Sequence, residues 1–164
     1  MSSERNTFET IVHKYSHPLY WYIRRIVVSH EDAQDILQET FIKAYRHLWQ
    51  LRSGDRLKAW LYRIATNEAG RFLTKNRSTE QITAMLEEKL AAPQHIDNAD
   101  EAEIKLQKAL LKLSPQQKTV FCLRYYDEMD YRQIAKITGS KIETLKVSYH
   151  YAKEKIKKYL EESI

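Results

Sequence analysis

The stretch MDYRQIAKITGSKIETLKVSYHYAK (residues 129–153) contains two helical patterns that are separated by Gly139 and Ser140. Glycine adopts the left-handed conformation that closes many helices, and the chain has only three glycines. We therefore expect one helix over 131–138, a stop at Gly139 and a new helix capped by Ser140. Two helices joined by so tight a turn cross steeply, which predicts a helix-turn-helix.

Capping boxes divide the C-terminal part of the chain into helices. In this motif a Ser, Thr or Asp at the N-cap is followed three residues later by Glu or Gln. The pairs are Ser114 with Gln117, Asp130 with Gln133, and Ser140 with Glu143. Pro115 follows the first cap, at the helical position that tolerates proline best. Each pair predicts a separate helix start.

The helix after Gly139 has one apolar stripe and one polar face. The stripe, at spacings of three and four, consists of Ile142, Leu145, Tyr149, Ala152 and Ile156. A helix with such an exposed polar face fits the major groove of DNA. The candidate DNA contacts are Lys141, Thr144, Lys146, Ser148, His150, Tyr151 and Lys153, with Arg124, Arg132 and Lys153 suited to phosphates. Similar two-helix corners also occur in proteins that never bind DNA, so the pattern leaves both interpretations open.

The composition predicts an all-α protein. The chain has 164 residues, three Gly, three Pro and long runs of good helix formers, and it lacks alternating strand patterns. No apolar run approaches the length of about 18 residues expected of a membrane span, and the polar N-terminus does not resemble a signal peptide. We therefore expect a cytoplasmic protein. Cys122 is the only cysteine, which excludes an internal disulfide and favours a buried thiol.

Charge is distributed unevenly along the chain. Residues 1–78 carry 13 Lys and Arg against 8 Asp and Glu, residues 79–104 carry 1 against 7, and residues 105–164 carry 13 against 7. Basic modules suit nucleic acids because neutralised phosphates release counterions, although charged residues also serve simply as solvated helix faces. We predict two small helical domains, 1–76 and 103–164, joined by a flexible acidic linker, 77–102. A short helix over 80–90, introduced by Ser78, is expected within the linker.

The N-terminal domain shows a second amphipathic pattern. DAQDILQETFIKAYRHLWQL (residues 32–51) and LKAWLYRIATNEAGRFLTKNR (57–77) each carry one apolar stripe. The predicted core positions are Ala33, Leu37, Phe41, Ala44, Leu48, Trp60, Leu61, Ile64, Ala65 and Phe72. The other face of the second stretch mixes amide, hydroxyl, aromatic and basic groups, which suits single-stranded nucleic acid.

These two stretches resemble a known family. The segments DAQDILQETFIKAYRHLWQL and KAWLYRIATNEAGRFL are similar to region 2 of bacterial sigma factors, and LSPQQKTVFCLRYYDEMDYRQIAKITGSKIETLKVSYHYAKEKIKKYL is similar to region 4. Regions 2 and 4 without the others are typical of the extracytoplasmic function (ECF) group of the sigma-70 family. The resemblance implies a non-enzymatic subunit that brings core RNA polymerase to promoters and promotes DNA melting.

The resemblance also implies roles for particular residues. Asp35, Gln38, Glu39 and Ile42 match the surface that binds the clamp of the polymerase large subunit; on physical grounds alone, a solvated acidic face is the alternative interpretation. The loop 50–59 matches the segment that traps a flipped base of the promoter −10 element. The implied single-strand contacts are Arg56, Lys58, Tyr62, Arg63, Thr66, Asn67, Arg71 and Lys75. The second helix of the helix-turn-helix matches the reader of the −35 element. Further implied partners are the polymerase flap and an anti-sigma factor, often membrane-bound.

Departures from the family pattern affect promoter choice. Ser148 and Tyr151 stand where the family often has arginines, and Arg71 stands where it often has an acidic residue. Losing arginine forks removes a common way of reading guanine. The resemblance therefore predicts the class of protein and leaves the promoter sequence open.

Two other classes compete with this interpretation. An enzyme is disfavoured: His13 and His17 have zinc-binding spacing, but no metalloprotease glutamate, phosphate loop or nucleophile motif accompanies them. We expect no catalytic residue, metal or cofactor. An autonomous helix-turn-helix regulator would use the same C-terminal corner, but we would then expect a ligand pocket, receiver or dimer interface in the N-terminal half.

Overall fold

The described part of the protein consists of helices. The computed structural model describes residues 2–51, 56–92 and 101–162, with side chains from residue 7 onward, and this part contains helices and turns and no strand. The predicted all-α class is confirmed. Within these ranges, no helix combines the length and apolar character that crossing a membrane requires.

The first module contains three long helices, α1 (Ser2–Val27), α2 (His30–His47) and α3 (Leu57–Thr74), with a short 3-10 turn, η1 (Leu48–Gln50), after α2. The helix α2 begins where Ser29 Oγ accepts a hydrogen bond from the backbone N–H of Asp32 at 3.3 Å, which satisfies one of the free donors of the first turn. Apolar residues of all three helices form the core, including Ile23, Phe41 and Leu61. Removing this surface from water is the main stabilising contribution to the module.

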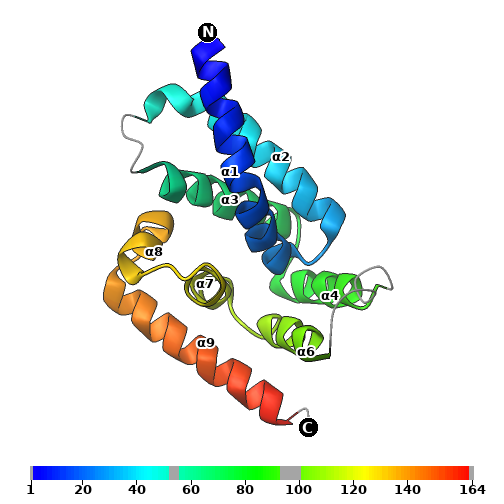
Figure 1. The fold of residues 1–164 in the computed structure, drawn as a ribbon. Coiled ribbons are helices and arrows are strands. Elements are labelled where there is room, and N and C mark those ends of the chain that lie inside the picture. The colour runs from blue at the N-terminus through cyan, green and yellow to red at the C-terminus, as the bar shows by residue number, and fades with distance from the viewer. Residues whose placement is uncertain (1, 52–55, 93–100, 163–164) are drawn as a thin grey trace.

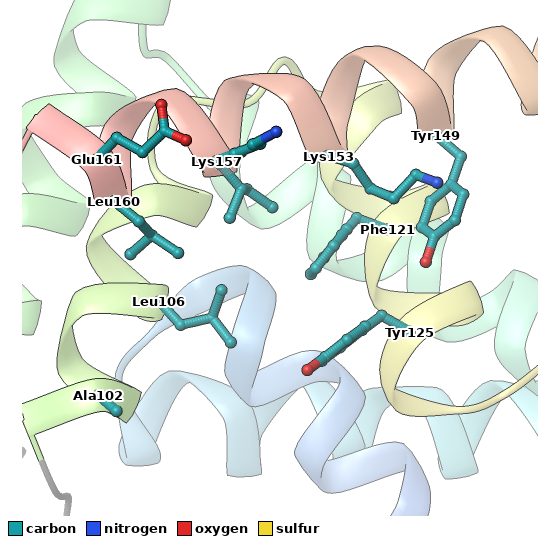
Figure 2. A pocket seen from close by; sticks show the side chains of 10 residues that line it. Ala102, Leu106, Phe121, Tyr125, Tyr149, Lys153, Lys157, Leu160 and Glu161 are labelled. Atoms are coloured by element: carbon teal, nitrogen blue, oxygen red, sulfur yellow. The ribbon is translucent and has the colours of Figure 1, made fainter.

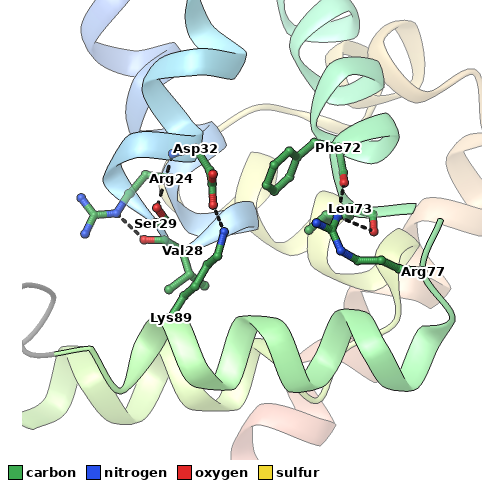
Figure 3. Close-up of polar contacts among 8 residues, drawn as sticks. All are labelled: Arg24, Val28, Ser29, Asp32, Phe72, Leu73, Arg77 and Lys89. Carbon is green, nitrogen blue, oxygen red and sulfur yellow. Dashed lines mark hydrogen bonds and ion pairs between the residues drawn. The ribbon is translucent and has the colours of Figure 1, made fainter. Parts of the chain in front are cut away.

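The helix α4 (Thr79–Leu90) confirms the helix predicted inside the linker. Ser78 and Gln81 form the expected capping box. The helix is not a free tether, because Leu86 and Leu90 pack on Val28 at the end of α1 and Lys89 forms an ion pair with Asp32 (Figure 3). At least this part of the predicted flexible linker is thus folded against the first module. Residues 93–100, which hold the rest of it, lie outside the described residues.

The C-terminal module contains α6 (Glu101–Leu110), α7 (Pro115–Phe121), a π-helical turn η3 (Cys122–Tyr126), α8 (Tyr131–Thr138) and α9 (Ile142–Glu162). Two predicted capping boxes, at Ser114 and at Asp130, are present. Gly139 ends α8 in the left-handed conformation, with φ of 76°, so the predicted stop is confirmed. The helix pair α8 and α9 forms the helix-turn-helix.

One capping prediction is wrong. The helix α9 begins at Ile142, and its first hydrogen bond joins the N–H of Leu145 to the carbonyl of Lys141, so Lys141 rather than Ser140 occupies the cap position. Ser140 Oγ instead accepts a hydrogen bond from the Gln116 amide at 3.3 Å. The contact with a residue distant in sequence explains why local spacing misplaced the cap.

The two modules pack against each other. The helix α8 lies against α3, and η3 lies against α1, so one apolar core runs from Ile11 in the first module to Ile156 in the second (Figure 1). Cys122 is fully buried in this core, as predicted, and burial raises the pKa of its thiol to about 12. The contact between modules decides which polar faces remain open to partners.

Candidate nucleic-acid interface

The outer face of α9 is open to solvent. Its predicted contacts Lys141, Thr144, His150 and Tyr151 are exposed, and Ser148 is half-buried. Tyr151 is 55% exposed although it is a large aromatic residue, and its ring meets that of His150 with centroids 5.4 Å apart. The helix is held from behind by buried Leu145, Ala152 and Ile156. A rigid helix with hydroxyl, amine and aromatic groups on its free face is the arrangement that reads base edges in a major groove.

Two predicted lysines of α9 lie along its flank. The ammonium group of Lys146 lies 5.9 Å from the ring centroid of Tyr131, and that of Lys153 lies 4.8 Å from the ring centroid of Tyr149. These cation–π contacts fix the amines beside the helix. Lysines in this position suit phosphates of the DNA backbone better than base edges.

The two arginines predicted to hold phosphates differ in their surroundings. Arg132 on α8 is exposed. Arg124 is half-buried, donates to the carbonyl of Met129 at 3.0 Å and lies 4.9 Å from the ring centroid of Tyr131. Its guanidinium therefore braces the turn between η3 and α8. No spacing rule indicates this role, because the acceptor is a backbone carbonyl in an irregular turn.

The face of α3 predicted to bind single-stranded DNA is only partly open. Its members Arg56, Lys58, Arg63, Asn67, Arg71 and Lys75 are exposed, and Thr66 is half-buried. Tyr62 was expected on this outer face, and that expectation is wrong, because its side chain is 1% exposed. The reason is tertiary: the C-terminal module covers the middle of the face. Residues 52–55 of the predicted base-trapping loop lie outside the described residues.

A buried tyrosine and a carboxylate link the modules. The hydroxyl of Tyr62 donates to Oδ1 of Asp127 at 3.3 Å, and burial raises the pKa of Tyr62. Burial also raises the pKa of Asp127 to about 6, although the positive charge of Arg25 and the Tyr62 hydrogen bond partly oppose this shift. The second carboxylate oxygen, Asp127 Oδ2, is buried without a hydrogen-bond partner in the described structure. The packing of the two modules therefore leaves a partly desolvated carboxylate at the contact between them.

Further contacts cover the rest of the middle of α3. Arg63 donates to the carbonyl of Lys136 on α8. Thr66 shares a hydrogen bond of 2.7 Å with the buried hydroxyl of Tyr22. The guanidinium of Arg25 on α1 lies 3.9 Å from the ring centroid of Tyr126 on η3, which adds a cation–π contact between the modules. We call this packing of the two modules against each other the closed arrangement. In it, a DNA strand cannot reach Tyr62.

The predicted polymerase-binding residues form a patch on α2. Asp35, Gln38 and Glu39 are exposed, and Ile42 is half-buried. The helix is fixed to α3 by an ion pair between Lys43 and Glu68, and Glu68 also pairs with Arg71 at 3.2 Å. The ion pair with Glu68 orients the side chain of Arg71 along the surface of α3. The α2 patch lies away from the contact between the modules and remains accessible.

The C-terminal module carries an apolar groove between α6, η3 and α9 (Figure 2). Its volume is about 550 Å³, and its walls include Leu106, Phe121, Tyr125 and Leu160, with Lys153 at one edge. Tyr125 stacks on Phe121 with ring centroids 5.0 Å apart and is 55% exposed. Sequence reasoning missed this groove, because the two helices that frame it are about 40 residues apart in the chain. An apolar groove of this kind suits the apolar face of a partner helix.

The pair of histidines considered as a zinc site is exposed on α1. His17 makes an edge contact with Trp21, with ring centroids 6.3 Å apart. Within the described ranges, no group of three or more His, Cys, Asp or Glu side chains is arranged to hold a metal ion.

Family models match two separate stretches of the chain. The sequence models of Sigma-70 region 2 and Sigma-70 region 4 match residues 11–79 and 103–156. The chain is 29% identical to the RNA polymerase sigma-H factor of Pseudomonas aeruginosa, with 96% of this chain and 88% of that protein covered. It is also 29% identical to the ECF RNA polymerase sigma factor SigW of Bacillus subtilis, with 96% and 90% covered.

Two solved structures share the fold. One is the sigma factor RpoE in complex with the anti-sigma factor NepR from Bartonella quintana, with a TM-score of 0.75, 21% identity, and 94% of this chain and 97% of that chain covered. The other is CnrH in complex with the cytosolic domain of CnrY, with a TM-score of 0.73, 21% identity, and 98% and 91% covered.

Proposed function

The chain belongs to the sigma-70 family, in its ECF group, and from this premise we propose that it is an RNA polymerase sigma factor whose two modules contact different parts of one promoter. The observation that carries the proposal is the pairing of regions 2 and 4, in that order, with a rigid recognition helix exposed on region 4. The chain itself supplies promoter recognition, and core polymerase supplies the chemistry.

The second module reads the −35 element as duplex DNA. Thr144, Ser148 and Tyr151 contact base edges from the free face of α9, while Lys146, Lys153 and Arg132 contact phosphates on either side. Phosphate contacts fix the register of the helix, and base contacts select the sequence. Positions 148 and 151 hold Ser and Tyr rather than arginines. Hydroxyl and aromatic contacts therefore select the promoter sequence.

The first module binds the −10 element as a melted strand. Arg56, Lys58, Asn67 and Lys75 are exposed along α3 and supply backbone and base contacts. Tyr62 becomes available only when the second module leaves α3, because it is buried there, and Arg63, although exposed, donates to the carbonyl of Lys136 until then. Promoter melting thus requires the modules to separate.

Two protein surfaces serve core polymerase. The α2 patch of Asp35, Gln38, Glu39 and Ile42 binds the clamp of the large subunit through its acidic and apolar groups, and the groove around Tyr125 receives the flap. Both surfaces are accessible in the closed arrangement. Initial docking to polymerase therefore precedes the opening of the modules.

An anti-sigma factor is the natural inhibitor of such a protein. The RpoE structure contains the anti-sigma factor NepR, the CnrH structure contains the cytosolic domain of CnrY, and both RpoE and CnrH have the fold of this chain. We infer that a partner of this kind acts on this chain by holding the modules in an inactive arrangement. It competes with polymerase for the α2 patch and the groove.

An autonomous helix-turn-helix regulator is the other candidate, since α8 and α9 alone would serve it. It is less favoured, because the N-terminal half matches region 2 rather than a receiver or ligand-binding domain. The two functions differ in their dependence on core polymerase, which an experiment resolves directly.

Transcription in vitro with bacterial core polymerase across a promoter library tests the proposal. We expect transcripts only when chain and core are both present, and enriched promoters with two conserved elements. A double charge reversal, Asp35→Arg with Glu39→Arg, should remove core binding, while Glu87→Arg on the exposed face of α4 should not. Promoter binding that is equally tight and specific without core would favour the autonomous regulator.

A further inference from the structure

A cavity that is partly open to solvent lies where the two modules meet. Its volume is about 370 Å³, and α1, α3, α4, α7 and α8 all contribute to its walls. Sites for small molecules have volumes of about 300 to 1,000 Å³ and occur preferentially between domains. This cavity is separate from the DNA-reading face of α9 and from the groove around Tyr125.

A buried lysine faces this cavity without a partner. Lys118 on α7 lines the cavity and is 7% exposed. Within the described ranges its ammonium group makes no hydrogen bond and no ion pair. Burial lowers the pKa of this lysine, because no carboxylate compensates the charge. An uncompensated buried cation is costly, so a lysine here is favourable when an anion accompanies it.

Other polar side chains of the cavity walls restrict the class of ligand that can bind. The hydroxyls of Thr74, Thr83 and Thr138 donate to carbonyls of their own helices, so they offer acceptors rather than donors to the cavity. Asn67 also lines the cavity, and its amide has no hydrogen-bond partner within the described ranges. Lys118 is the one charged side chain among the described residues that line the cavity, which matches a single anionic group.

The remaining walls are apolar. Ile26 comes from α1, Ile82 and Leu86 from α4, and Ile137 from α8. A doubly charged phosphate would place two charges against one cation in this apolar space, which is unfavourable. A carboxylate on a hydrocarbon body matches both the single charge and the apolar walls.

We propose that the cavity between the modules binds a small organic acid, with its carboxylate on Lys118 and Asn67 and its hydrocarbon part against the isoleucines. Both modules contribute walls, so a bound acid stabilises the closed arrangement by mass action. If the chain acts as the proposed sigma factor, such a ligand lowers the population that is able to bind melted DNA. The binding site itself does not depend on that function.

The test uses the isolated full chain, octanoate as the probe and NMR of isoleucine methyl groups. Octanoate should shift the methyl signals of Ile26, Ile82 and Ile137 in a saturable manner, while Ile11 and Ile36 outside the cavity serve as reference signals. The uncharged analogue 1-octanol should bind more weakly. Lys118→Met should weaken octanoate binding by about tenfold or more, since it removes a charge-assisted hydrogen bond. Lys105→Met, on the exposed face of α6, should leave it unchanged.

A second variant fills the cavity and keeps the lysine. Gly70 lines the cavity, and a Cβ added there meets nothing within 4 Å, so Gly70→Leu should place its side chain in the cavity and prevent binding. Without octanoate, Lys118→Met should melt no lower than the parent chain, because it removes an unpaired buried charge; a marked drop would indicate a structural lysine instead. Absence of saturable shifts in the parent chain up to about ten millimolar, a concentration at which affinities are already weak, or equal binding by parent and both variants, would overturn the proposal.

Discussion

The outer faces of α3 and α9 carry the same kinds of side chain but have different surroundings. Both faces mix basic, hydroxyl and aromatic groups, and both are predicted to bind DNA. On α9 the aromatic Tyr151 is 55% exposed, whereas on α3 the aromatic Tyr62 is 1% exposed under the C-terminal module. Duplex DNA can therefore reach α9 in the closed arrangement, but a single strand cannot reach the middle of α3. The difference means that the contact between modules, rather than the composition of a face, decides when the face is available.

Cross-linking the two modules should have the largest effect, because it should prevent DNA binding by α3 and leave DNA binding by α9 unchanged. In an Arg63→Cys, Lys136→Cys variant joined by a short thiol-reactive cross-linker, the second module cannot leave α3. We expect promoter melting in the presence of core polymerase, measured with a fluorescent base at the −10 element, to fall to background. Native Cys122 should not react, because it is fully buried with a raised pKa.

The same cross-linked chain supplies its own control. Its affinity for a −35 duplex, measured without polymerase, should match that of the uncross-linked double variant, because α9 stays exposed. The Arg63→Cys variant treated with the reagent measures the cost of losing the Arg63 contact itself, and the Lys136→Cys variant treated with the reagent should still support melting. Full melting by the locked chain would show that α3 can bind its strand without separation of the modules.

Removing Arg25 should loosen the contact without affecting the α9 face. Arg25→Ala deletes the cation–π contact with Tyr126 and removes the positive charge that most opposes the rise in the pKa of Asp127. The expected loss in the free energy of closure is about 2 kcal/mol. Hydrogen exchange should become faster in the middle of α3, and Lys14→Ala, at an exposed position of α1, should leave exchange there unchanged. Unaltered exchange in Arg25→Ala would show that this contact does not hold the modules together.

Removing one phosphate contact of the α8–α9 pair should have a smaller effect, which lowers the affinity for every duplex sequence by the same amount. Arg132→Ala should weaken duplex binding by about 1 kcal/mol for every sequence and lower the salt slope by about one counterion. Fluorescence anisotropy at several salt concentrations measures both quantities. Lys158→Ala, near the end of α9, is the matched control with an unchanged slope. A change in sequence preference in Arg132→Ala would assign this residue to base reading.

Acidification should have the smallest effect and should favour closure. The pKa of Asp127 is raised to about 6 when the modules are closed, so the closed state takes up a proton more readily than an open state in which this carboxyl is solvated. Closure is therefore strengthened as pH falls through about 6 and weakened as pH rises through that value. Because the side chain is only partly buried, the expected change between pH 7.5 and 5.5 is about 0.5 kcal/mol.

Fluorescence energy transfer between labels at Glu31→Cys and Lys158→Cys measures this equilibrium. Asp127→Asn should remove the pH dependence and keep the hydroxyl of Tyr62 paired with an amide oxygen. Closure that strengthens as pH rises would mean that attraction between Arg25 and the ionised carboxylate outweighs the cost of burying it.

Local patterns predicted much of the fold, and long-range contacts account for the misses. The stop at Gly139 and the caps at Ser78, Ser114 and Asp130 were correct, since each depends on atoms within a few residues. The cap at Ser140 was wrong because Gln116, far away in sequence, binds its hydroxyl. The outward position of Tyr62 was wrong because periodicity within one helix cannot reveal a second module that covers its polar side.

The amino-acid sequence by itself determined the helical class, the helix-turn-helix and the family, because these depend on short spacings and on two matching regions in order. Only the tertiary structure decided that α4 packs on the first module, that Tyr62 is buried and that Lys118 faces a cavity between the modules. These features depend on how residues far apart in the chain meet. That outcome is set by the burial of apolar surface shared between the two modules, which no local pattern encodes.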